Sequence, residues 1–128
     1  MHMGRRLVIA GAFLGLMGVL LGAFGTHFLE GILKADGRQS VFDTAVQYQF
    51  IHALAILFVS TAIRRWPGGL TRAAGVLFSI GTVLFCGSLY ILAIFNIPFM
   101  GAVAPIGGVA LILGWLCLML MAWQNNIA

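Results

Sequence analysis

The sequence predicts an all-α membrane protein: a four-transmembrane-helix bundle with its N-terminus and its C-terminus both in the cytoplasm. Hydrophobic residues make up 62% of the 128-residue chain and charged residues only 8%. A soluble domain this short could not bury so much apolar surface. The chain also contains four uncharged runs that are each long enough to cross a bilayer. We therefore expect a single transmembrane domain over residues 1–128, with no separate soluble module.

The four spans are delimited by charged residues and, once, by a helix breaker. A helix rises about 1.5 Å per residue, so roughly 20 apolar residues cross the hydrocarbon. No charged residue occurs from Ala73 onward, and Asn96-Ile97-Pro98 divides this stretch into two spans. The expected spans are residues 7–29, 43–63, 73–96 and 101–123. Each must be helical, because an open backbone in lipid would leave its polar groups unsatisfied.

The start of the chain admits a second interpretation. Arg5 and Arg6 followed by an apolar run are typical of a signal peptide, and Ala23-Phe24-Gly25 matches a cleavage-site pattern. The run is long for a signal peptide, however, and three further spans follow it. We therefore expect an uncleaved first helix.

Basic residues predict the orientation, because cytoplasmic connections are enriched in Lys and Arg. The connection between spans one and two offsets Lys34 and Arg38 with three acidic residues. The N-terminal segment and the connection between spans two and three carry the other arginines: Arg5, Arg6, Arg64, Arg65 and Arg72. These segments are expected in the cytoplasm. The net charge of +4 then indicates the lipid bilayer as the partner, and not nucleic acid.

The outer connection, residues 28–42, has the pattern of a short helix. Its apolar residues share one helical face, and Glu30 and Lys34 are four residues apart. We expect a helix that lies in the outer interface of the membrane and ends at Asp36-Gly37.

Span one carries a stripe of glycines with a period of about 3.5 residues. The five glycines of this stripe are Gly11, Gly15, Gly18, Gly22 and Gly25. Because glycine has no Cβ, another helix can approach closely along the stripe. Two alternatives stay open. The stripe packs within the chain, with the small residues from Gly75 to Cys86 in span three as its mate, or it joins copies of the chain in a homo-oligomer.

Polar side chains within spans one to three are candidate binding residues, because such groups are costly inside a membrane. They are His27, Asp43, Gln47, Gln49, His52, Ser88 and Tyr90. All are expected in the outer half of the membrane, whereas the inner half is almost purely apolar. Gln49 and His52 share one face of span two. Asp43 and Gln47 lie on another face, so span two is expected between two neighbours. The alternative is that these groups hydrogen-bond across helices and only fix the packing.

No catalytic pattern accompanies these residues. The sequence contains no GxSxG, HExxH, P-loop or dinucleotide-binding motif. Histidines on two helices could ligate haem iron, but the chain has no CxxCH. Cys86 and Cys117 occur singly in apolar runs and are expected to be small buried hydrophobes. We therefore expect neither a cofactor nor a metal, and not an enzyme.

Several strings of the sequence occur together in a known family. In order they are Gly22-Ala23-Phe24-Gly25-Thr26-His27, Thr44-Ala45-Val46-Gln47-Tyr48-Gln49 with His52-Ala53-Leu54, Gly87-Ser88-Leu89-Tyr90, and Pro105-Ile106-Gly107-Gly108 with Gly114-Trp115. With these strings the chain resembles, over nearly its whole length, the small bacterial membrane proteins of domain-of-unknown-function family 423, the YgdD-like group, related to eukaryotic transmembrane protein 256. Thr26 departs from the pattern, in which alanine is more frequent. The resemblance implies a bacterial inner-membrane protein and supplies no established activity.

Two main functional hypotheses follow. In the first, the protein is a small-solute or ion transporter or channel-like protein. His27 and His52 would relay protons, Gln47 and Gln49 would line the site, and Asp43 would attract cations. In the second, it is a non-transporting interaction or assembly protein that packs through the glycine stripe. A third hypothesis is an enzyme or redox subunit that acts on a lipid or a quinone.

Overall fold

The computed structural model describes residues 2–35 and 37–127, apart from the side chain of Thr26. The described chain is helical almost throughout, with four helices long and apolar enough to cross a membrane. These are α1 (His2–Leu20) continued by the π-helical turn η1 (Leu21–Gly25), α4 (Gln39–Arg65), α5 (Gly69–Phe95) and α6 (Met100–Gln124). Two short helices, α2 (Thr26–Phe28) and α3 (Glu30–Ala35), join the first span to the second. The all-α, four-span fold is confirmed.

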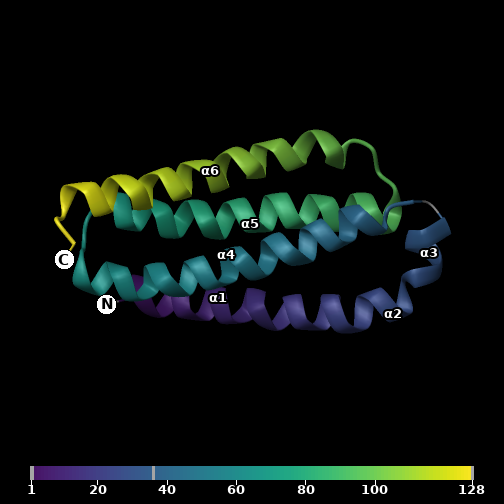
Figure 1. The fold of residues 1–128 in the computed structure, drawn as a ribbon, viewed down its shortest axis with the longest axis horizontal. Helices are drawn as coiled ribbons and strands as arrows, with labels where there is room; N and C mark the ends of the chain where they lie inside the picture. Colours follow the sequence, from purple (N-terminus) through teal and green to yellow (C-terminus); the bar gives the residue numbers. More distant parts are fainter. Residues whose placement is uncertain (1, 36, 128) are drawn as a thin grey trace.

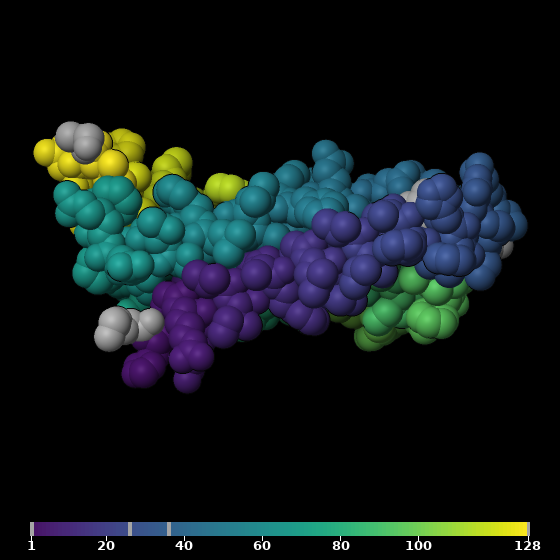
Figure 2. Space-filling view, turned by 90° about the horizontal axis from the view of Figure 1, so that it is seen from below, coloured from purple at the N-terminus to yellow at the C-terminus, as the bar shows by residue number. Residues whose placement is uncertain are grey.

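The long helices lie side by side in chain order (Figure 1). Helix α4 packs between α1 and α5, and α6 packs on the other side of α5. In the space-filling view, α1 lies along the flank of α4 over most of its length (Figure 2). Both ends of the chain lie at one end of the bundle (Figure 1). The assignment of this end to the cytoplasm is the prediction that rests on the arginines.

The helices extend beyond the charges that bound the expected spans. Helix α1 begins at His2 and includes Arg5 and Arg6, and α4 runs on to Arg65. Charged residues mark where the hydrocarbon ends. The backbone gains by continuing its hydrogen bonds into the headgroup region, so the helix itself ends later.

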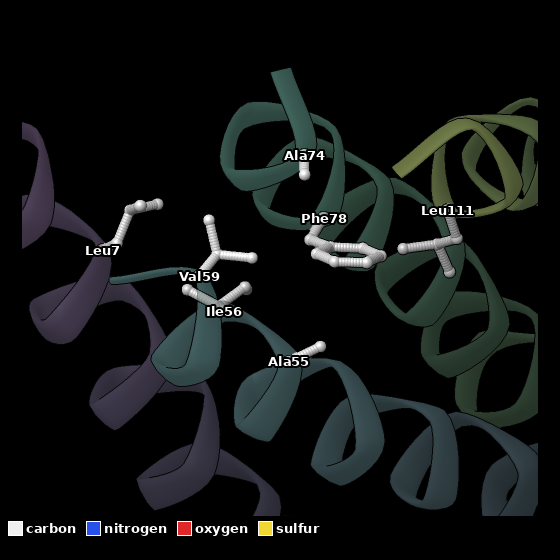
Figure 3. Packing of buried hydrophobic residues seen from close by; sticks show 7 residues of the cluster. All are labelled: Leu7, Ala55, Ile56, Val59, Ala74, Phe78 and Leu111. Atoms are coloured by element: carbon white, nitrogen blue, oxygen red, sulfur yellow. The ribbon is translucent and has the colours of Figure 1, made fainter. Parts of the chain in front are cut away.

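One apolar core joins all four long helices (Figure 3). Its buried members are Leu7, Ala55, Ile56, Val59, Ala74, Phe78 and Leu111. Val59 and Phe78 are fully buried, and Leu7 of α1 reaches towards Val59 of α4. The half of the bundle nearer the chain termini is therefore held by apolar packing, as expected from its composition.

The glycine stripe packs against α4 within the chain. The prediction that the small residues of span three would contact it is therefore wrong. A Cβ on Gly11 would lie 2.8 Å from Leu57, and a Cβ on Gly25 would lie 2.8 Å from Phe42. Gly18 and Gly22 face Phe50 and Val46 in the same way, whereas Gly15 has no atom within 4 Å. Large side chains of α4 fill most of the stripe, and at Gly11 the carbonyl oxygen of Ala53 also lies 3.0 Å from the Cβ position. The stripe is thus mainly a groove for side chains, with one close backbone contact at Gly11.

The expected short helix in the outer connection is α3, and it packs on the bundle. Leu33 is fully buried beside Phe42 and Ala93. The Lys34 ammonium donates a hydrogen bond to the Glu30 carboxylate and lowers the pKa of that carboxyl. The helix ends before Gly37, whose φ of 66° is the left-handed conformation that glycine tolerates. Asp36, the other half of the expected stop signal, lies outside the described residues.

Arg38, between α3 and α4, bonds this end of the bundle to α5. Its Nε donates a 2.7 Å hydrogen bond to the carbonyl oxygen of Ala93. That carbonyl is in the last turn of α5, where helical acceptors lack a partner within the helix. An arginine that the sequence analysis used only for orientation therefore also caps a helix.

Among the glycines, Gly107 has the closest backbone neighbour, and this contact joins α6 to α5. A Cβ on Gly107 would lie 2.4 Å from the backbone N of Phe85 and 3.0 Å from the carbonyl oxygen of Gly81. A Cβ on Gly81 would lie 3.1 Å from the carbonyl oxygen of Gly107. These neighbours are backbone atoms, which cannot rotate away. Glycine at position 107 is therefore required for the two helices to touch.

Gly107→Ala should lower the free energy of unfolding by about 1–3 kcal/mol, the usual range for overpacking. The matched control is Gly15→Ala, because a methyl group there meets open space and should cause no loss. Both are measured by SDS titration of the purified protein in detergent, followed by circular dichroism. Equal stability of the two variants would contradict the backbone contact.

Candidate functional site

Gln49 ties three helices together at the centre of the bundle. It lies on α4 and is only 3% exposed. Its Nε2 donates a 2.8 Å hydrogen bond to the carbonyl oxygen of Leu14 on α1. Its Oε1 accepts a 2.5 Å hydrogen bond from the hydroxyl of Tyr90 on α5. One amide group therefore links both neighbours of α4, the central position that the sequence predicted for span two.

His52 forms a second bridge, from α4 to α6. Its Nε2 lies 3.1 Å from the indole Nε1 of Trp115, and its Nδ1 lies 2.7 Å from the carbonyl oxygen of Tyr48. An indole N–H can only donate, so Nε2 must accept. The proton of the neutral ring is then on Nδ1, which donates to the Tyr48 carbonyl. Both ring nitrogens are occupied, and the side chain is 4% exposed.

Aromatic rings enclose this histidine. The ring centroids of His52 and Phe78 are 5.7 Å apart, and those of Phe78 and Trp115 are 4.9 Å apart. Tyr48 stacks on the His52 ring at 5.9 Å and contacts Phe85 at 5.0 Å. The imidazole is therefore surrounded by protein rings from α4, α5 and α6. The cavity of about 1000 Å³ that the described residues form lies elsewhere, near the chain termini.

The other candidate residues do not join these two bridges. Ser88 is buried, but its hydroxyl donates to the carbonyl oxygen of Phe85 in its own helix. Asp43 is exposed and accepts a 2.9 Å hydrogen bond from Gln39. His27 and Gln47 are also exposed. The polar residues therefore do not surround one common space.

His52 lies at the midpoint of α4, because it is thirteen positions from each end of the helix, Gln39 and Arg65. Asp43 and Gln47 lie closer to Gln39, at the end of α4 that follows α3. The expected position of these residues in the outer half of the membrane stays a prediction, because it depends on the predicted orientation.

Trp115, the partner of His52, has no role in the functional hypotheses drawn from the sequence. A tryptophan at the middle of a span, away from the interfacial belt, needs an acceptor for its N–H. Its position in the final span was therefore a usable signal. The carbonyl of Leu14 carries no comparable signal, because any helical carbonyl can accept a second hydrogen bond.

Four apolar spans joined by buried hydrogen bonds define a small multi-pass membrane protein. The chain belongs to the DUF423 family: the family model described as "Protein of unknown function (DUF423)" matches residues 21–108. This confirms the resemblance drawn from the sequence strings.

Named relatives are similar over most of their length. The chain is 43% identical to "UPF0382 membrane protein YwdK" of Bacillus subtilis (strain 168) over 116 residues, which cover 90% of this chain and 94% of the relative. It is 38% identical to "UPF0382 inner membrane protein YgdD" of Escherichia coli (strain K12) over 111 residues, which cover 87% and 84%. No solved structure matches. These names and the four candidate spans confirm the expected localisation, a multi-pass protein of the bacterial inner (plasma) membrane.

The hydrogen bond between Tyr90 and Gln49 should appear as a coupling energy in a double-mutant cycle. Tyr90→Phe, Gln49→Leu and the double variant should show a coupling of about 0.6–2 kcal/mol, the range for hydrogen bonds between transmembrane helices. Unfolding in an SDS titration measures it.

Tyr48→Phe is the matched control for this cycle. The Tyr48 hydroxyl has no recorded hydrogen bond to a described residue, and its ring is 40% exposed. Its removal should show no coupling to Gln49→Leu. A coupling as large as that of Tyr90→Phe would mean that the cycle reports general packing and not the hydrogen bond.

Proposed function

We propose that this protein is a non-enzymatic, non-transporting membrane interaction protein, and that it assembles with a second copy of itself through the outward face of α4. The observation that carries this proposal is Gln47. Its amide is exposed within a span, whereas the buried side chains of Gln49 and His52 have partners inside the chain. An assembly gives the exposed amide a partner, and a transport site would need the buried groups instead.

The buried polar groups are poorly suited to bind a solute. Gln49 and both ring nitrogens of His52 already hydrogen-bond to protein atoms. Among the described residues, the only buried side-chain oxygen or nitrogen without a hydrogen-bond partner is Oε1 of Gln39, near the outer end of α4. A proton on Nε2 of His52 would oppose the indole N–H of Trp115, so a relay would first have to break that bridge.

Gln47 occupies a different environment. It lies eight residues after the start of α4 at Gln39, which is about 12 Å along the helix. Its amide has no recorded hydrogen bond to a described residue. On the same outward face Ile51, Leu54 and Phe58 are exposed. The face is therefore an apolar stripe with one amide, and an amide facing lipid alone is unfavourable.

A second copy of the chain satisfies this amide. The glutamine side chain contains both a donor and an acceptor, so two Gln47 side chains related by a two-fold axis can bond each other. Such interhelical bonds stabilise membrane helix pairs. The glycine stripe is less suited to this role than the second hypothesis assumed, because Phe42, Val46, Phe50 and Leu57 of the same chain occupy it.

Gln47→Leu should weaken dimerisation about fivefold, since such a hydrogen bond contributes roughly 1 kcal/mol. Gln124→Leu makes the same chemical change at an exposed glutamine near the end of α6 and should have no effect. Single-molecule photobleaching in bilayers at graded protein density measures the dimer fraction.

The interface itself is tested by cysteine crosslinking in a Cys117→Ala background. Leu54→Cys should crosslink, and Ile112→Cys on α6 should not. A monomer at every density would overturn the proposal.

Proton transport through His52 is the competing function, and it has its own test. Proteoliposomes loaded with a pH-sensitive dye are subjected to a potassium diffusion potential. We expect the wild type and His52→Ala to acidify no faster than empty liposomes. A wild-type flux that His52→Ala abolishes while the fold is retained would replace the assembly proposal with the transport hypothesis.

A further inference from the structure

A basic cavity lies at the end of the bundle that holds the chain termini. It has a volume of about 1000 Å³ and is lined by the start of α1, the last turns of α4 and the start of α5. Figure 2 shows the first residues of α1, in purple, beside the teal residues where α4 ends and α5 begins. Four guanidinium groups line it: Arg5, Arg6, Arg64 and Arg72. Two parts of the chain that are far apart in the sequence, the start of α1 and the junction of α4 with α5, therefore bring positive charge to one hollow.

No acidic side chain among the described residues lines this cavity. The described acidic residues, Glu30 and Asp43, lie at the opposite end of the molecule, in α3 and at the outer end of α4. None of the four arginines has a recorded hydrogen bond or ion pair with a described residue. By contrast, Lys34 pairs with Glu30, and Arg65 lies over the ring of Trp66 at 5.7 Å. Like charges repel across the hollow unless an anion enters it.

The arginines are also not placed to stabilise their own helices. Arg72 lies in the first turn of α5, and Arg5 and Arg6 follow closely on the start of α1. The N-terminal end of a helix carries partial positive charge, so cations are unfavourable there and anions are favourable. The two helix starts therefore add to the positive potential in the cavity.

We propose that this cavity binds the phosphate of an anionic phospholipid headgroup. Guanidinium groups bind phosphate oxygens through paired hydrogen bonds. The volume is at the upper end of the range for ligand sites, which leaves room for a glycerol phosphate. Met3, Val8 and Ile63 add apolar surface to the same lining. A ligand with an anionic head and an apolar body fits these walls, and free phosphate would use only the arginines. This inference does not depend on the proposed assembly.

The experiment separates a specific site from general attraction of basic residues to anionic membranes. Purified protein in neutral detergent is titrated with phosphatidylglycerol, phosphatidylcholine or inorganic phosphate. Bound lipid is counted by native mass spectrometry, and the melting temperature is recorded. The test variants are Arg64→Gln alone and Arg64→Gln with Arg72→Gln. The control matched to the single variant is Arg65→Gln, which removes one charge from the neighbouring residue, outside the cavity lining.

Phosphatidylglycerol should bind and raise the melting temperature, and phosphatidylcholine should not. The double variant should bind phosphatidylglycerol more weakly by about fivefold for each arginine removed, and Arg65→Gln should bind as the wild type does. Arg64→Lys with Arg72→Lys should recover only part of the affinity, because lysine lacks the paired donors. If the double variant does not fold, as judged by circular dichroism, Arg6→Gln replaces it.

Three other results would overturn the phospholipid site. If inorganic phosphate displaces phosphatidylglycerol and gives the same shift, the site is a phosphate site whose ligand is the free ion, and the lipid assignment is overturned. Equal binding of the two lipids would overturn the site. An equal loss in Arg65→Gln and in Arg64→Gln alone would also overturn it, because it would show a diffuse effect of charge.

Discussion

Hydrocarbon offers no hydrogen-bonding partners, so polar groups inside a membrane must be satisfied by the protein itself. Two of the buried polar side chains of α4, those of Gln49 and His52, bond to other helices, and the order of the helices follows from where they bond. Gln49 reaches the Leu14 carbonyl on one side and the Tyr90 hydroxyl on the other. His52 reaches across to Trp115 of α6. Through these bonds α4 contacts every other span, and this fits its place inside the row.

The polar bridges depend on close helix packing, which the glycines provide. On α1, Gly11 and Gly18 admit Leu57 and Phe50 of α4, and this brings α4 near enough for Gln49 to reach the Leu14 carbonyl. Between α5 and α6, Gly107 brings the backbones into contact at Phe85. This contact draws α6 towards α5, so that Trp115 can reach His52 beyond α5. Glycine and polar residues therefore act together. The glycines set the distance between neighbouring helices, and the polar side chains fix the rotation of each helix about its axis.

The number of spans, the apolar core near the chain termini and the short helix between the first two spans were predictable, because each follows from the order of charged and apolar residues along the chain. The partner of the glycine stripe was not, since a stripe specifies a close neighbour without saying which one. For the candidate site, helical angle correctly separated Gln49 and His52 from Asp43 and Gln47. The helical angle could not show that Gln49 and His52 bond to other helices while the other two residues are exposed. The positions of residues around one helix do not say where the neighbouring helices lie. Trp115 was missed because its partner is sixty-three residues away.

The basic residues have different surroundings at the two ends of the bundle. At the outer end, Arg38 caps α5 and Lys34 pairs with Glu30, so their charge is used within the chain. At the other end, the arginines of the basic cavity have no acidic neighbour among the described residues. The positive-inside tendency predicts their side of the membrane but does not specify how they are arranged. It would be satisfied equally by arginines on separate exposed surfaces. Their convergence from α1, α4 and α5 on one hollow is a property of the fold, and repulsion among them opposes it unless an anion is held between them.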